Sequence, residues 1–377
     1  MSKWPDKYVI GLTGNIATGK SVVRRMLEHL GAYGIDADAL AHRAIAKGAP
    51  GYMPVVSAFG RWLLDDNSEI DRKQLGKLVF SNPEALVVLE NTIHPYVNQA
   101  IDLLIRRASQ RTIVIEAIKL LESNLAQACD TIWTTYAQES VQVARLVSKR
   151  GMSESDALLR IRMQNPQDEK RARADVIIQN VGSFENTWNQ VLAAWTVISP
   201  IMDTSPTVIP KVPRGELIVK RGRPSDSMEI AGLVTRLENG RIARTHQDVM
   251  EEFGEKAFLL LEKDDELMGL AAWQVENLVS RITEIYVDPQ VDQPRALKSL
   301  MAEVEKSSRD LQCEASLLFL TDELTRRGSV WDDLGYEKRT LESLKVQAWQ
   351  DAVRESMPDN TNLYFKQLRK DRILRPI

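Results

Sequence analysis

Residues 14 to 21 form a glycine-rich pattern with a lysine and a serine, which is suited to holding phosphate groups. They read Gly-Asn-Ile-Ala-Thr-Gly-Lys-Ser and lie between an apolar run and a helical stripe. The glycines let successive backbone N–H groups point into one concavity, where phosphate oxygens bind. Lys20 should reach the β- and γ-phosphates, and the Ser21 hydroxyl should bind Mg²⁺. The residues expected to hold the nucleotide are Gly14, Asn15, Ile16, Ala17, Thr18, Gly19, Lys20, Ser21 and Val22.

Two carboxylates, Asp36 and Asp38, end a short apolar run just after this helix. Residues at the carboxyl ends of strands face the ligand crevice of an open α/β sheet. A carboxylate there can accept the proton of a substrate hydroxyl or bind Mg²⁺ through water. Both residues also suit capping of the helix expected from Ala39, and this alternative stays open.

Eight basic residues lie from Arg145 to Arg173, in a helical segment interrupted by loops. A lid that closes over phosphates would bring guanidinium groups, such as those of Arg145 and Arg150, onto the transferring phosphoryl group and would exclude water. A solvated basic face is the alternative, and it suits Lys149, Arg171 and Arg173 better.

Short β-branched runs alternate with helical patterns in the first half of the chain. Strands are predicted at 8–12, 112–115, 131–135 and 176–178, and residues 39–111 read as an inserted helical subdomain. This alternation predicts an α/β domain with a parallel sheet.

The second half has a different pattern. A helix is expected at 227–238, followed by an antiparallel meander at 257–262, 266–275 and 281–287. A helix at 296–311 and strands at 315–320 and 362–367 complete an α+β domain.

A proline-rich segment separates the two patterns. Residues 199–215 contain Pro200, Pro206, Pro210 and Pro213, which interrupt helices, so they are predicted to form a linker. The domains are therefore expected at 1–198 and 216–377. Each half is expected to fold by itself.

Composition limits the classes of partner. The 377 residues are 44% hydrophobic and 27% charged, a composition typical of a globular protein. The net charge of −3 gives no overall positive field that would attract nucleic acid. Cys129 and Cys313 are too far apart in sequence for a zinc motif or a disulfide framework. No apolar run approaches a membrane span, so a cytoplasmic protein without a membrane partner is expected. The sequence carries no signal for an oligomeric state.

From Tyr8 to Trp195 the chain resembles the dephospho-CoA kinase family. The resemblance is carried by the segments GLTGNIATGKS, IDADALAHRA, His94-Pro95, EAIKLLE, Gln142–Gln164 and ADVIIQNVGS. It implies transfer of the γ-phosphate of ATP to the ribose 3′-hydroxyl of dephospho-CoA.

The resemblance also implies roles for individual residues. Asp38 would be the catalytic base and Arg145 the arginine that stabilises the transition state. Asn180 would begin an adenine-contacting turn, Asp36 and Asp38 would lie at the acceptor, and His94 would orient the acceptor or simply pack. Many members have Asp-Ile-Pro-Leu-Leu where residues 117–121 read Ala-Ile-Lys-Leu-Leu, which leaves Glu116 as a metal-side carboxylate or a helix cap.

Residues from about Glu216 to Leu368 resemble the GNAT N-acetyltransferases in strand order and in the segment Trp331–Glu337. The glycines of the family's pyrophosphate loop are missing from residues 287–297, where Asp292 adds a negative charge. Trp331 replaces the usual acidic tyrosine, and Glu284 is either a base or a polar strand residue. An inactive GNAT-like domain for binding, dimerisation or regulation is expected. The alternatives are a bifunctional kinase and N-acetyltransferase, or a nucleotide or CoA sensor.

Overall fold

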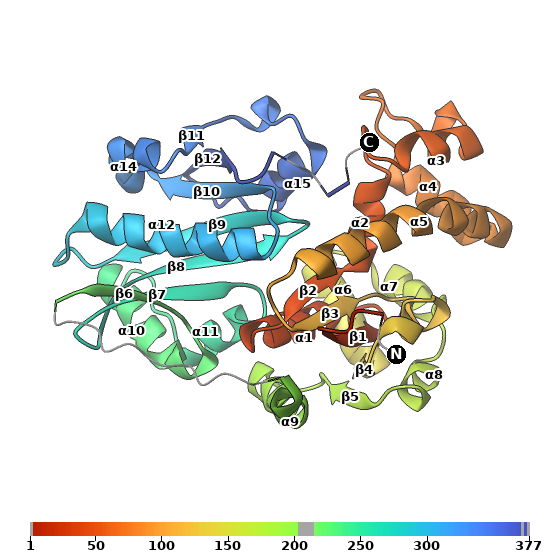
Figure 1. The fold of residues 1–377 in the computed structure, drawn as a ribbon, viewed down its shortest axis with the longest axis horizontal. Helices are drawn as coiled ribbons and strands as arrows, with labels where there is room; N and C mark the ends of the chain where they lie inside the picture. The colour runs from red at the N-terminus through yellow and green to blue at the C-terminus, as the bar shows by residue number, and fades with distance from the viewer. Residues whose placement is uncertain (1–2, 203–214, 371–372, 375–377) are drawn as a thin grey trace.

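The computed structural model describes residues 3–202, 215–370 and 373–374, and it contains two β-sheets, one in each half of the chain (Figure 1). The first sheet has five parallel strands in the order β2-β3-β1-β4-β5. Its strands are β1 (Tyr8–Gly14), β2 (Tyr33–Asp36), β3 (Thr112–Glu116), β4 (Thr131–Tyr136) and β5 (Val176–Gln179). The predicted α/β class is confirmed.

Helices cover both faces of this sheet, because alternate residues of its buried strands point to opposite sides. On one face Ile10 and Leu12 pack with α1 (Lys20–His29) and α9 (Phe184–Met202). On the other face Val9 packs with α2 (Ala37–Ala44) and α5 (Pro83–Arg107). The sheet therefore holds the phosphate loop, at the start of α1, and Asp38, on α2, at its carboxyl edge.

The expected helical subdomain is present, and the segment predicted to form a lid is helical. The subdomain consists of α2, α3 (Tyr52–Phe59), the short turn η1 (Arg61–Leu63), α4 (Arg72–Ser81) and α5. The lid segment consists of α6 (Glu139–Arg150), α7 (Glu154–Arg162) and α8 (Gln167–Ala172). Two further short turns, η2 (Leu120–Glu122) and η3 (Ala126–Ala128), lie between β3 and β4.

The second sheet has seven strands in the order β11-β12-β10-β9-β8-β7-β6. They are β6 (Leu217–Arg221), β7 (Ala257–Lys263), β8 (Glu266–Glu276), β9 (Val279–Val287), β10 (Ala315–Thr321), β11 (Glu337–Lys338) and β12 (Thr361–Gln367). The meander β7-β8-β9 is antiparallel as predicted, whereas β9 and β10 pair in parallel.

Helices also cover both faces of the second sheet. Leu259 and Leu261 face α12 (Gln293–Asp310), and Phe258 and Leu260 face α10 (Ser227–Leu237) and α11 (His246–Glu252). The face opposite α12 also carries α15 (Gln347–Ser356), packed on Leu317. The remaining short elements are η4 (Pro224–Asp226), α13 (Asp322–Thr325), α14 (Gly328–Asp333) and η5 (Leu341–Ser343).

One predicted boundary differs from the structure. Helix α9 extends to Met202, past the predicted domain end at 198, although Pro200 lies within its bounds. Residues 203–214 of the predicted linker, including Pro206, Pro210 and Pro213, lie outside the described residues. Helix α1 begins at Lys20, with Gly19 at φ 95° as its N-cap.

One hydrophobic cluster contains residues of both halves, although each half also has a cluster of its own. Leu278, at the tip of the β8–β9 hairpin, packs into the cluster that contains Leu40 and Leu104 of the first half. Leu374, near the C-terminus that Figure 1 shows beside α2, belongs to the same cluster. The prediction that each half folds by itself stays a prediction.

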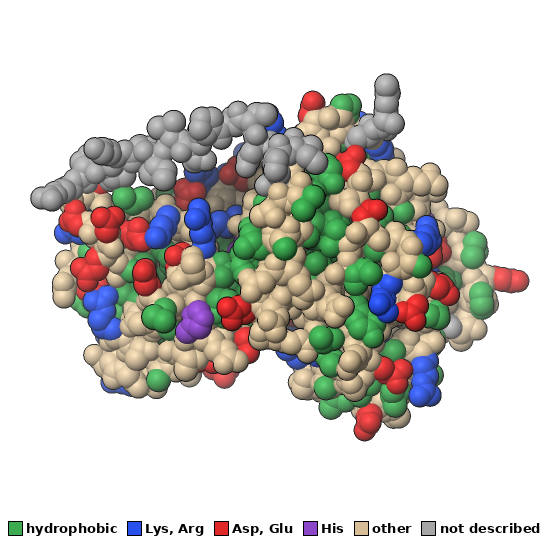
Figure 2. Space-filling view, turned by 90° about the horizontal axis from the view of Figure 1, so that it is seen from below, with side chains coloured by type: hydrophobic (Ala, Val, Ile, Leu, Met, Phe, Trp, Pro, Cys, Tyr) green, Lys and Arg blue, Asp and Glu red, His purple; other side chains and the backbone are tan. Residues whose placement is uncertain are grey.

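The surface matches the balanced composition. On the face in Figure 2, basic and acidic side chains are interspersed over both lobes. In the described part of the chain, no helix is both long and apolar enough to cross a bilayer.

Candidate active site

The phosphate loop is fixed by backbone conformations that few side chains tolerate. Gly19 has φ 95°, and a Cβ there would lie 1.8 Å from Nδ2 of Asn180. A Cβ on Gly14 would lie 2.3 Å from Oγ1 of Thr135. Both positions need glycine because the loop backbone runs close against its neighbours. Ala17 also has a positive φ, of 58°, which its residue type does not predict.

Lys20 lies at the start of α1 with its ammonium group inside the loop. The side chain is buried, and Nζ donates a hydrogen bond to the Asn15 carbonyl at 3.2 Å. Burial lowers the pKa of Lys20, whereas the nearby charges of Glu116 and Asp38 favour its protonated form. The ammonium thus lies where the pattern predicts a phosphate contact.

Glu116, at the carboxyl end of β3, forms hydrogen bonds with two residues of α1. Oε1 accepts a hydrogen bond from Ser21 Oγ at 2.8 Å, and Oε2 accepts one from Arg24 Nε at 2.8 Å. Burial alone would raise the pKa of Glu116, but Arg24 and Lys20 hold it below its ordinary value. The structure therefore places a charged carboxylate beside the Ser21 hydroxyl.

Asp36 and Asp38 have different partners. Asp36 Oδ1 accepts a hydrogen bond from the Ala39 N–H at 2.8 Å, so Asp36 is the N-cap of α2. Asp38 Oδ2 accepts one from the Ile118 N–H at 3.0 Å. Burial raises the pKa of both carboxyls, that of Asp36 to about 6, and Lys20 partly offsets the increase at Asp38. The capping alternative thus holds for Asp36 and not for Asp38.

Arg145 and Asn180 hold the phosphate loop from outside. Arg145 Nη1 donates to the Ala17 carbonyl at 3.1 Å, and Nη2 donates to the Asn180 carbonyl at 2.9 Å. The buried Asn180 side chain donates from Nδ2 to the Thr18 carbonyl at 3.0 Å and accepts from Thr187. Its amide is therefore engaged with the loop rather than free to contact a base.

The lid segment packs directly on the phosphate loop. Ile16 and Ala17 contact the cluster of Leu146, Ala157 and Ile161 from α6 and α7. Arg150, at the end of α6, is exposed and near enough to Lys20 for its charge to lower the pKa of that lysine. Two of the basic side chains expected in a lid therefore lie around the phosphate site.

Some residues of the site are not indicated by the sequence patterns. Gln142 donates to the Ile16 carbonyl at 2.6 Å, and the Ile16 N–H donates to the Gln164 side chain at 2.7 Å. Lys170, one of the eight basic residues, is buried and donates to the Ile118 carbonyl at 2.6 Å. A run of mixed polar residues gives no signal for such long-range contacts.

His94 is not joined to this group. It lies exposed on α5 before Pro95, and it makes no hydrogen bond or ion pair with any described residue. Its predicted role at the acceptor stays a prediction.

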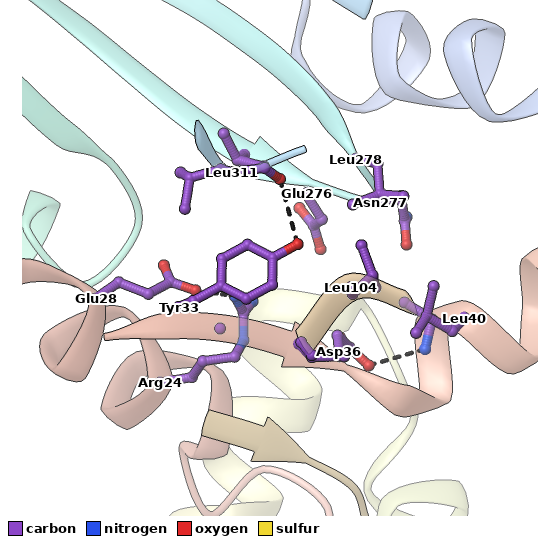
Figure 3. A pocket seen from close by; sticks show the side chains of 14 residues that line it. Arg24, Glu28, Tyr33, Asp36, Leu40, Leu104, Glu276, Asn277, Leu278 and Leu311 are labelled. Carbon is purple, nitrogen blue, oxygen red and sulfur yellow. Dashed lines mark hydrogen bonds and ion pairs between the residues drawn. The ribbon is translucent and has the colours of Figure 1, made fainter. Parts of the chain in front are cut away.

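A small cavity lies beside Asp36, at the junction of the two halves (Figure 3). It has a volume of about 50 Å³ and is lined by Arg24, Tyr33, Glu276 and Leu278, among others. The Tyr33 hydroxyl donates to the Leu311 carbonyl at 3.5 Å across this junction. The second half thus contacts β2, the strand that ends at Asp36.

The predicted acetyltransferase residues of the second half have structural partners. Glu284 forms ion pairs with Arg244 and Lys256, which hold its pKa below the ordinary value against the effect of burial. Trp331 is fully buried and donates to the Leu324 carbonyl at 2.8 Å. Asp292 caps α12 by accepting from the Arg295 N–H at 2.9 Å, so a carboxylate already occupies that helix end.

A glycine-rich phosphate loop on a parallel sheet, with carboxylates at the neighbouring strand ends, defines a P-loop phosphotransferase. The family model for dephospho-CoA kinase matches residues 8–186. The chain is 42% identical over 187 residues to the dephospho-CoA kinase of Carboxydothermus hydrogenoformans, which covers 49% of this chain and 91% of that protein. It is 43% identical over 190 residues to that of Geobacter metallireducens, which covers 50% of this chain and 94% of that protein.

The chain belongs to the dephospho-CoA kinase family, and its N-terminal half carries the ATP-dependent kinase activity. A solved dephospho-CoA kinase from Campylobacter jejuni is 28% identical and covers 51% of this chain and 97% of its own, with a TM-score of 0.35.

The second half is similar to solved GNAT-family acetyltransferases. One from Staphylococcus aureus Mu50 is 15% identical and covers 41% of this chain and all of its own, with a TM-score of 0.33. The role of this half is not indicated by that similarity.

Proposed function

We propose that Asp38 is the general base that removes the proton from the ribose 3′-hydroxyl of dephospho-CoA. The hydroxyl oxygen then bonds to the γ-phosphorus of ATP, the bond to the bridging oxygen breaks, and ADP and CoA leave. The observation that carries this assignment is the position of the carboxylate. Asp38 lies at the sheet edge with Oδ2 bound to the Ile118 N–H, while Oδ1 has no hydrogen bond within the described structure. A raised pKa makes Asp38 a stronger base than an exposed aspartate.

Cations around the loop would stabilise the negative charge of the transferring phosphoryl group. Lys20 is positioned inside the loop, whereas Arg145 on α6 holds the loop from outside through the Ala17 carbonyl and Arg150 at the end of α6 is exposed. A cation fixed as Lys20 is lowers the barrier because the developing negative charge meets it without further reorganisation. The family's use of ATP supports this arrangement.

The residues beside Lys20 fit Mg²⁺, which would help neutralise the phosphates. Ser21 Oγ and Glu116 Oε1 are hard oxygen donors 2.8 Å apart. Across the described residues, no group of three or more His, Cys, Asp or Glu side chains is arranged to hold a metal. Ser21 would therefore bind the ion directly, Glu116 would act beside it, and phosphate oxygens and water would complete its coordination.

Replacement of Asp38 tests the assignment of the base. Asp38→Asn keeps the size and the hydrogen bond from Ile118 but removes the proton acceptor, so kcat for dephospho-CoA should fall about 10²–10⁴-fold. Coupled detection of ADP release measures it, with adenosine, AMP and buffer as other acceptors.

Asp66→Asn is the matched control, because Asp66 is an exposed aspartate of the same half. That variant should keep its turnover. Near-native turnover in Asp38→Asn would show that another group takes the proton.

A further inference from the structure

A cleft of about 900 Å³ separates the helical subdomain of the kinase half from the segment that leads into α15 of the second half. Figure 1 shows these elements facing each other near the C-terminus. The kinase wall includes His42, Arg72 and Lys73, and the opposite wall includes Lys345 and Gln350. A volume of this size is within the range of small-molecule sites.

The acidic residues of the cleft are mostly engaged. Asp65 accepts backbone N–H groups of its turn, Asp71 caps α4, and Glu69 accepts from the Lys47 N–H. Asp351 is paired with Arg354 at 3.0 Å. Only Glu342 among the acidic lining residues has no such partner among the described residues.

Three basic side chains are exposed in the cleft without a partner in the part of the chain that the structure describes. They are Arg72 and Lys73 at the start of α4, and Lys345 before α15. The lining as a whole holds five Lys or Arg and five Asp or Glu residues, but its exposed cations without an ion-pair partner come from both halves of the chain and can pair with an anionic ligand.

The cleft begins one helical turn from Asp38, which is not itself among the lining residues. His42 lies one turn after Asp38 on α2, on the same face of that helix, and it lines the cleft. Burial and the charge of Arg72 lower the pKa of His42, while Asp38 opposes them. The charges of Asp38 and Arg72 thus both act on His42, which connects α2 to the lining of the cleft.

Buried contacts between the halves fix the cleft walls. Arg43, on α2, donates to Glu314 Oε1 at 2.7 Å and to the Asn277 carbonyl at 2.7 Å. The side chains of Arg43 and Glu314 are 7% and 1% exposed. A cleft between walls held in this way is preformed, which reduces the entropy lost on binding.

We propose that this cleft binds the diphosphate-bearing arm of the acceptor, and that Lys345 of the second half contacts that arm. The proposal rests on the proposed function, because it places the ribose at Asp38. Dephospho-CoA continues beyond that ribose into two phosphates and an amide chain, whose charge needs cations. The second half would then form part of the acceptor site.

The test is a charge reversal in the full chain. Lys345→Glu should raise the Kd for dephospho-CoA, measured by calorimetry without ATP, and its KM at least about tenfold. The kcat at saturation and the KM for ATP should stay within twofold, because Lys345 touches neither the nucleotide nor the reacting atoms. Lys345→Arg keeps the charge and should restore the affinity.

Lys338→Glu is the matched control, since Lys338 is an exposed lysine of the second half outside the cleft. An unchanged Kd in Lys345→Glu, or an equal increase in Lys338→Glu, would overturn the proposal. The calorimetric Kd does not depend on turnover. The binding result can therefore be interpreted even if Asp38 is not the base.

Discussion

Asp36 and Asp38 are only two residues apart, yet different hydrogen-bond partners give their carboxylates different roles. Asp36 uses its carboxylate to cap α2, and Asp38 is placed by the Ile118 N–H at the neighbouring strand end. An N-cap satisfies backbone donors that would otherwise be left free, so its main contribution is to the helix. The helix that Asp36 starts is the one that carries Asp38, the proposed base.

His29 should make the free energy of unfolding depend on pH. Its Nε2 lies 2.8 Å from the Phe253 carbonyl, so Nε2 carries the proton, and Nδ1 is buried without a partner among the described residues. Burial and the charge of Arg221 lower the pKa of His29 to about 3. Unfolded chains bind this proton near pH 6.5, so the free energy of unfolding should decrease as the pH falls from about 6.5 towards 3.

Denaturant titrations at several pH values check this expectation. His29 should contribute a slope of up to about 1.4 kcal/mol per pH unit in that range. His29→Gln can still donate to the Phe253 carbonyl but does not titrate, so its slope should be smaller. His94→Gln, at an exposed histidine, should keep the slope of the parent chain. Equal slopes in all three proteins would contradict the assignment.

Among the elements, the β8–β9 hairpin links the two halves. Asn277 and Leu278 form its turn with φ values of 52° and 60°, a conformation that costs a leucine free energy. Leu278 is 9% exposed in the kinase core, and Figure 3 shows it opposite Leu40 and Leu104. Burial of this side chain offsets the backbone strain.

Replacement of Leu278 should therefore loosen the hairpin from the kinase half. Leu278→Asn suits the left-handed backbone but removes the buried apolar contact, so the free energy of unfolding should fall by about 2–5 kcal/mol. Because the hairpin contacts α2 through Arg43, kcat for dephospho-CoA should fall as well.

Asn277→Gly is the matched control for the hairpin. It keeps both the turn and the backbone carbonyl that accepts from Arg43. Chemical denaturation and steady-state kinetics on both variants decide the outcome. If Leu278→Asn were as stable as the parent chain, the Leu278 side chain would not hold the hairpin to the kinase half.

At the scale of the whole molecule, the kinase half is covered by the second half on α1, α2 and α5. The contacts include the buried pair Arg43–Glu314 and the apolar side chains of Leu278, Ile373 and Leu374. A fragment ending at Met202 would expose this surface and leave Arg43 without its partner, which is costly for a buried charge.

We expect the fragment ending at Met202 to keep the reaction but lose stability and acceptor affinity. Its thermal midpoint should lie about 10 °C or more below that of the kinase half in the full chain, because several kcal/mol of burial are lost. Its KM for dephospho-CoA should rise, whereas its KM for ATP should change little. A fragment with unchanged midpoint and kinetics would show that the second half is a passive attachment.

The sequence by itself determined the features that depend on neighbouring residues. The spacing of Gly14, Gly19, Lys20 and Ser21 fixes the phosphate loop, because backbone conformation there depends on residue type. The strand and helix periods predicted most strands of both sheets, the meander and the helical subdomain, because these patterns are local, but they did not predict the edge strands β6 and β11. The acceptor and the base came from the resemblance to the kinase family.

Tertiary structure decided the rest, because it depends on contacts between residues far apart in the chain. Only folding brings Arg24 and Ser21 to Glu116, Gln142 and Gln164 to Ile16, and Lys170 to the end of β3. Pairing across two hundred residues also joins Arg43 to Glu314 and creates the cleft between α4 and α15. No periodicity encodes such pairs, since burial and geometry select them only once both sheets have formed.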